Sequence, residues 1–67
     1  MDVRGRLARN LIALRQKKGW SQEDLADEAG LQRTYVSGVE RSIRNPTILI
    51  VERLAKALKV SLGALLE

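Results

Sequence analysis

The sequence contains no cysteine and no histidine, and these two absences remove much of the chemistry available to small proteins. Disulfides are impossible without cysteine, and a zinc site made only of carboxylates is rare. Nucleophilic pairs such as Ser-His or Cys-His are also excluded, as is any side chain whose ordinary pKa lies near neutrality. We therefore expect no enzymatic activity, no metal site and no cofactor.

Aromatic residues and long apolar runs are scarce as well. Trp20 and Tyr35 are the only aromatic residues, too few to form a platform on which successive bases of a single strand could stack. No apolar run approaches the roughly 18 residues that span a bilayer, and no apolar segment follows the arginines of residues 1–9 as in a signal peptide. The prediction is a soluble cytoplasmic protein that does not associate with membranes.

The short chain is enough for one domain, predicted to span residues 1–67, in which hydrophobic residues make up 45%. A domain of this size has a small core and is commonly stabilised further by disulfides, a metal or a partner subunit. Because the first two are excluded, oligomerisation is the remaining means of stabilisation.

Apolar residues recur with helical spacing along nearly the whole chain. Between Val3 and Leu14 they repeat every three or four positions, and Gly19 ends this first helix. Four more helices are predicted, at residues 21–29, about 33–41, about 47–58 and 61–66. No segment alternates with period two, so the predicted fold class is all-α with five short helices.

Two helix starts carry recognisable capping residues. Ser21 is predicted to cap the second helix, with Asp24 completing a capping box. The fourth helix has two interpretations: Asn45 caps it with Pro46 at the first position, or Thr47 is the cap. In both cases its inward face is predicted to carry Ile48, Val51, Leu54, Ala55 and Leu58.

Positive charge is concentrated at the N-terminal end. The net charge is +4, divided as +5 over residues 1–20, −2 over residues 21–44 and +1 over residues 45–67. An anionic partner must therefore meet particular cations and not a general positive surface.

Two short helices joined by a tight turn that contains Gly30 have the outline of a helix-turn-helix, at about residues 21–41. The segment GWSQEDLADEAGLQRTYVSGVERSIRNPT, residues 19–47, resembles the Cro and lambda-repressor type of helix-turn-helix, the XRE family. The resemblance continues through LAKALKVSLGALL and covers nearly the whole chain. Within the family, RTYVSGVERSIRNPT is most similar to the controller proteins of restriction-modification systems. The resemblance implies a lambda-repressor-like domain that binds double-stranded DNA.

In such a domain residues 33–41 are the recognition helix, which lies in the major groove with its N-terminal end at the base edges. Arg33 is the strongest candidate because a guanidinium binds guanine O6 and N7 with two hydrogen bonds, whereas its alternative role is a solvated charge. The predicted base-reading residues are Gln32, Arg33, Thr34 and Ser37. The predicted phosphate contacts are Ser21, Gln22, Tyr35, Arg41, Arg44 and Asn45. Packing is the alternative for Tyr35, and a solvated loop is the alternative for the last three.

The resemblance also implies structural roles. Arg15 at the end of the first helix is expected to pair with Glu40 at the end of the third, and Gln22 is expected to brace the first residues of the recognition helix. Gly38 stands inside that helix, where glycine costs ~1 kcal/mol relative to alanine. Tight packing against another helix and close approach to DNA are the two explanations.

The last two predicted helices hold more apolar residues than one small core needs. On a helical wheel Leu49 falls opposite the core face of the fourth helix, and Ile50 and Ala57 lie on a flank. The predicted dimer interface comprises Leu49, Ile50, Ala57, Leu62, Leu65 and Leu66; the alternative is that these residues fill the core. A two-fold dimer would set two recognition helices about one DNA turn apart, ~34 Å, to match a palindromic site.

The sequence thus predicts a transcriptional regulator that binds a palindromic operator as a homodimer, with restriction-modification genes as candidate targets. If it activates transcription, RNA polymerase is a further partner. The alternative is a protein-interaction module of the same fold, such as an antitoxin, whose apolar surface meets a different protein. No small-molecule ligand is evident.

Overall fold

The computed structural model describes residues 2–67; Met1, the first residue of the predicted domain, lies outside this range. Five helices follow one another in the order α1 (Val3–Lys17), α2 (Gln22–Ala29), α3 (Arg33–Glu40), α4 (Ile48–Leu58) and α5 (Leu62–Leu66). Residues 2–67 contain no strand, so the all-α prediction is confirmed. None of these helices is long and apolar enough to cross a membrane.

The side-chain caps explain where four helices begin. Asp2, Ser21, Thr47 and Ser61 each accept a hydrogen bond from a backbone N–H two or three residues later, at 3.0 to 3.3 Å. The Ser21 amide in turn donates to the Asp24 carboxylate, which confirms the capping box. Thr47 is the cap of α4, so the second of the two interpretations is correct. At Asp2, the bond from the Arg4 amide is the main cause that lowers the carboxyl pKa below its usual value.

The ends of α1 to α4 share one backbone motif. A residue in the left-handed conformation ends each helix, and the next amide donates to the carbonyl five positions earlier, at 2.8 to 3.1 Å. The left-handed residues are Gly19, Gly30, Ser42 and Lys59. The residues that follow them are Trp20, Leu31, Ile43 and Val60. All but Ile43, which is 67% exposed, pack against the core. The motif also ends α3 at Glu40, one residue before the predicted end.

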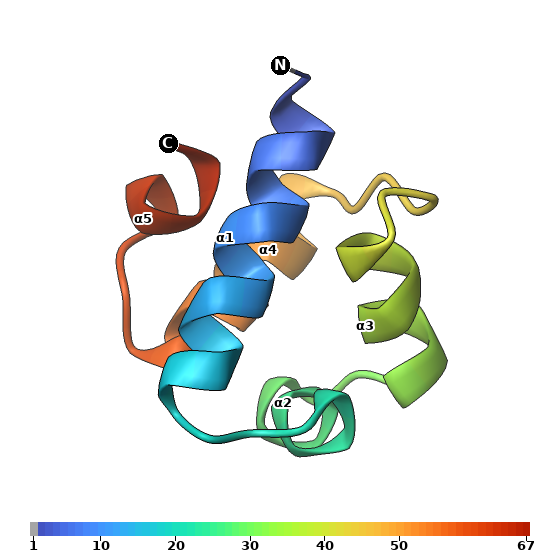
Figure 1. Cartoon of the computed structure of the whole chain (residues 1–67), viewed down its shortest axis with the longest axis vertical. Helices are drawn as coiled ribbons and strands as arrows, with labels where there is room; N and C mark the ends of the chain where they lie inside the picture. The colour runs from blue at the N-terminus through green and yellow to red at the C-terminus, as the bar shows by residue number, and fades with distance from the viewer. Residues whose placement is uncertain (1) are drawn as a thin grey trace.

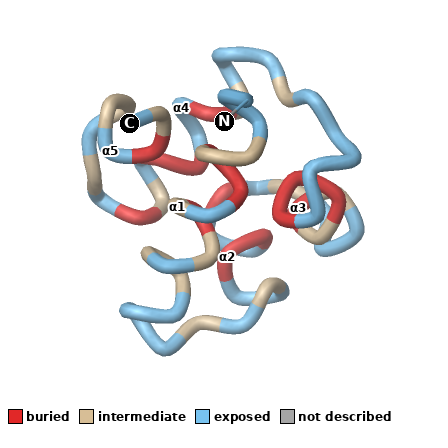
Figure 2. Tube along the Cα trace, turned by 45° about the horizontal axis from the view of Figure 1, so that its top comes forward, coloured by how far each residue is buried: buried red, intermediate tan, exposed pale blue. Residues whose placement is uncertain are grey.

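The helices surround a single core. Figure 1 shows α1 at the centre with α4 behind it, α3 and α5 on opposite sides and α2 across the lower end. Helix α1 packs against α3 and α5, and α4 packs against α2 and α5. The segments that Figure 2 marks as buried turn toward this centre. The largest fully buried side chains are Leu11, Leu25, Leu54, Leu58, Leu65, Val36 and Val39. This arrangement leaves the outer side of α3 uncovered.

Two predictions about apolar residues are wrong. Ile48 was expected on the inward face of α4 but is 56% exposed, because it stands in the first turn, beside a shallow groove of about 210 Å³ that Val3, Pro46 and Leu66 also line. Leu65 was expected at a dimer interface but is fully buried, because the short α5 packs on both α1 and α4 and turns this residue into the core. Leu65 therefore offers no surface to a second subunit.

Candidate nucleic-acid interface

The first turn of α3 lies at the surface with its polar side chains exposed. Gln32 is the N-cap residue by backbone conformation, yet its side chain makes no capping hydrogen bond. Arg33 and Thr34 follow and are exposed, while Ser37, one turn later, is half-buried. The opposite side of α3 is held in the core by Val36 and Val39. The structure thus gathers three of the four predicted base-reading residues on one exposed turn and leaves Ser37 partly covered.

The C-terminal end of α3 is held by a buried polar network. Arg15 Nε lies 2.7 Å from Glu40 Oε2 and Arg15 Nη2 lies 3.0 Å from Oε1, which confirms the predicted ion pair. A third donor of the same guanidinium, Nη1, bonds to the Trp20 carbonyl at 2.8 Å. Gln22 Nε2 donates to Glu40 Oε1 at 2.9 Å. Gln22 therefore braces the last residue of the recognition helix, because α2 begins beside Glu40, and the expectation that it braces the first residues is wrong.

The start of α2 keeps donors for an anion. The Ser21 hydroxyl oxygen accepts from the Asp24 amide, so its hydrogen remains available. The Gln22 amide nitrogen uses one hydrogen on Glu40 and retains the other. The first amides of a helix also favour negative charge. Both residues therefore have the chemistry that their predicted phosphate contacts require.

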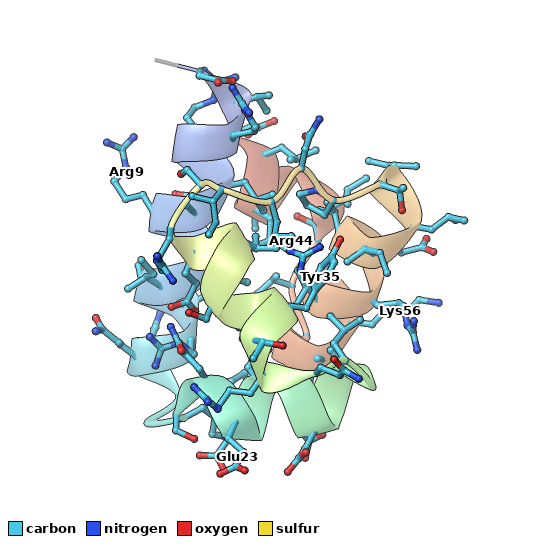
Figure 3. All side chains as sticks on the ribbon, turned by 90° about the vertical axis from the view of Figure 1, so that its right-hand side faces the viewer. Arg9, Glu23, Tyr35, Arg44 and Lys56 are labelled. Carbon is cyan, nitrogen blue, oxygen red and sulfur yellow. The ribbon has the colours of Figure 1, made fainter. Side chains whose placement is uncertain are left out.

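The three residues of the loop between α3 and α4 that were predicted to contact phosphate, Arg41, Arg44 and Asn45, are all exposed. Ser42 turns the chain back over α3, and the amide of Arg44 then donates to the Gly38 carbonyl at 3.2 Å. The Arg44 guanidinium lies over the half-buried Tyr35 ring, 5.4 Å from its centroid. Figure 3 shows the two side chains next to one another. Tyr35 therefore packs and supports a cation at the same time.

Gly38 is explained by this loop. A Cβ at position 38 would collide with Arg44 Cγ, so the glycine leaves room for the stem of Arg44. The two explanations drawn from the sequence were packing against another helix and close approach to DNA, and neither involved this loop. The arginine lies six residues away across a turn that reverses the chain, and no local pattern in the sequence identifies that contact.

Within residues 2–67, no group of three or more acidic residues is arranged to hold a metal ion. Every buried side-chain nitrogen or oxygen in this range has a hydrogen-bond partner. No buried polar atom in this range is left for a ligand to satisfy, so a ligand would meet exposed polar groups such as those of Gln32, Arg33 and Thr34.

Comparison with known proteins gives a consistent result. The family model HTH_3, described as helix-turn-helix, matches residues 11–65. A hypothetical transcription factor of Neisseria meningitidis is 49% identical over 65 residues, which cover 97% of this chain and 61% of that protein. The control protein C.SmaI of Serratia marcescens is 46% identical over 66 residues, covering 98% of this chain and 79% of the relative.

Among solved structures, the restriction-modification controller protein C.Esp1396I has been crystallised as a tetramer in complex with its natural 35 base-pair operator. It is 41% identical to this chain and superposes with a TM-score of 0.86. The match covers 91% of this chain and 80% of that one. The likeness therefore extends over nearly all of the five helices.

Proposed function

Because this chain belongs to the HTH_3 helix-turn-helix family of DNA-binding transcriptional regulators and is closely related to restriction-modification controller proteins, we propose that it binds a palindromic operator as a homodimer. Its relatives are regulators and it is not an enzyme. In this proposal α3 enters the major groove, with Arg33 and its neighbours at the base edges.

The single observation that carries the proposal is the exposed first turn of α3 on a helix that is held firmly at its other end. Gln32, Arg33 and Thr34 are exposed, while Glu40 is bonded to both α1 and α2. Base readout needs side chains in a defined position, since a bidentate guanidinium–guanine contact depends on its geometry. A braced helix with a free polar end meets this need.

Phosphate contacts on both sides of α3 would position the helix in the groove. Ser21 and Gln22 lie at the start of α2, and Arg41, Arg44 and Asn45 lie in the loop after α3. Contacts to phosphate set the register of a protein on DNA without reading sequence. We assign these residues that role.

The homodimer is supported by apolar side chains that the core does not cover. Leu49 is 69% exposed, and Ile50, Ala57, Leu62 and Leu66 each pack only partly against the core. A second copy that covers these residues would pair two α3 helices with two half-sites, ~34 Å apart. Relatedness to C.SmaI suggests restriction-modification genes as targets.

Selection of bound sequences from random double-stranded DNA tests the proposal directly. We expect two inverted half-sites with centres about 10 base pairs apart. A salt titration on the selected site should show a loss of ~10³–10⁵ in affinity between 50 and 200 mM salt, for about 6–10 phosphate contacts per dimer. Enrichment of no sequence, or a single asymmetric site, would contradict the proposal. The interaction-module alternative instead predicts association with another protein that salt barely changes.

A further inference from the structure

Gly38 lies in the middle of α3 and is buried, although it faces the loop that carries the exposed Arg44. A Cβ built on Gly38 would overlap Arg44 Cγ and would stand 3.4 Å from Nε and 3.5 Å from Cβ. The contact is with the base of the arginine side chain and not with its flexible tip. Arg44 would therefore have to adopt another rotamer if any side chain stood at position 38.

The backbone around Arg44 is anchored to the same residue. The amides of Ile43 and Arg44 both donate to the Gly38 carbonyl, at 3.0 and 3.2 Å. Ser42, in the left-handed conformation, makes the turn that brings them there. Since the Arg44 backbone is held against α3, the space above Gly38 decides which way its side chain leaves the loop.

That direction is toward the N-terminal half of the recognition helix. Tyr35 stands one turn before Gly38, on the same side of α3, because residues three apart are neighbours on a helix surface. The Arg44 guanidinium lies 5.4 Å from the Tyr35 ring centroid, inside the range of a cation–π contact. Figure 3 shows Arg44 next to Tyr35, which belongs to α3, the helix that also carries the exposed first turn.

We infer that Gly38 is a positioning residue for DNA binding. By lacking a side chain it forms a slot for the stem of Arg44, and the slot sets the Arg44 guanidinium on Tyr35, beside the exposed turn of α3. Gly38 touches no ligand in this account and acts through Arg44. The part of the inference that concerns DNA rests on the proposed function, whereas the part that concerns Arg44 does not.

A second helical glycine supplies a matched control. At Gly63 in α5, the nearest heavy atom to an added Cβ is the flexible carboxylate of Glu67, at 3.4 Å. Gly63→Ala therefore makes the same chemical change without displacing an arginine. Thermal unfolding of both alanine variants is the check that each is folded.

The placement of Arg44 is tested without DNA by nuclear Overhauser contacts between the Tyr35 ring protons and the Arg44 side chain. We expect these contacts in the wild-type chain and in Gly63→Ala, and their loss in Gly38→Ala. Their persistence in Gly38→Ala would overturn the slot. Their absence from the wild-type chain would overturn it too. The measurement on the wild-type chain can be made even if Gly38→Ala does not fold.

The consequence for DNA is tested by a double-mutant cycle on Gly38→Ala and Arg44→Ala, with fluorescence anisotropy on the selected operator. We expect each single variant to weaken binding by about tenfold, the size of one lost charge-assisted contact. The double variant should bind no more weakly than Arg44→Ala alone. Multiplying losses, or wild-type affinity in Gly38→Ala, would overturn the positioning role. If the wild-type chain binds no DNA, the proposed function fails while the Overhauser result for Arg44 still holds.

Discussion

The Arg15 guanidinium and the Glu40 carboxylate form a bidentate pair across 25 positions of the sequence, with Nε to Oε2 at 2.7 Å and Nη2 to Oε1 at 3.0 Å. The Glu40 side chain is only 3% exposed, and the side-chain amide of Gln22 donates one more hydrogen bond to its carboxylate. Three helices thus meet at one carboxylate. Loss of either charged partner leaves the other charge buried and unpaired.

Arg15→Ala is expected to lower the free energy of unfolding by about 3–5 kcal/mol, because the remaining Glu40 charge is desolvated without its partner. Chemical denaturation followed by circular dichroism measures this loss. Arg9→Ala is the matched control, since Arg9 is exposed on the same helix and projects away from it in Figure 3. Its effect should stay within about 0.5 kcal/mol. Equal effects of the two variants would contradict a structural role for the ion pair.

Lys59→Gly is expected to raise the free energy of unfolding by about 1 kcal/mol. Lys59 ends α4 with a φ of +59°, a left-handed conformation that costs most L-residues roughly 1–2 kcal/mol and costs glycine little. Lys56→Gly is the control, because the same change three residues earlier, inside α4, should lower stability by about 1 kcal/mol. Thermal unfolding distinguishes the opposite signs, and two changes of the same sign would be inconsistent with the conformation of Lys59.

Leu49→Glu is expected to abolish the proposed dimer while the chain remains folded. Leu49 is 69% exposed in the single chain, so a charge there costs little until a partner must cover it. Sedimentation at micromolar concentration should show a dimer for the wild-type chain and a 7.5 kDa species for the variant. Ile43→Glu, at a residue that is 67% exposed but outside the predicted interface, should leave the dimer intact. A wild-type monomer that also binds DNA as a monomer would rule out the proposed dimer.

Arg33→Ala is expected to weaken operator binding and to relax preference at one base position, at a cost of ~1–3 kcal/mol in discrimination. Arg41→Ala should weaken all sequences alike and reduce the salt slope by about one, as loss of a phosphate contact does. Binding measured on the operator and on single-base variants, at several salt concentrations, separates the two effects. Unchanged affinity and preference in Arg33→Ala would mean that the recognition helix has a different register on DNA.

Most of the fold could be predicted from local signals. The helical repeat of apolar residues, the caps at Ser21 and Ser61, and the glycines at positions 19 and 30 all act within a few residues. Errors appeared where burial depends on what lies beyond a helix end. Ile48 follows the apolar pattern of α4, yet it stands at the edge of a groove at the start of the helix and stays 56% exposed. Leu65 and Leu66 are adjacent leucines that the sequence does not distinguish. The packing of α5 against α1 and α4 decides that Leu65 is the buried one.

The sequence by itself determined the helices, the helix-turn-helix segment, the exposed polar turn at Arg33 and, through family resemblance, the pairing of Arg15 with Glu40. These properties depend on local spacing or on a known pattern of residues. Only the tertiary structure decided that Gln22 bonds to the end of α3 and that Arg44 crosses Gly38 to lie on Tyr35. The physical reason is that both contacts need the chain to reverse direction at helix ends, which places side chains from different elements in positions that no single stretch of sequence specifies.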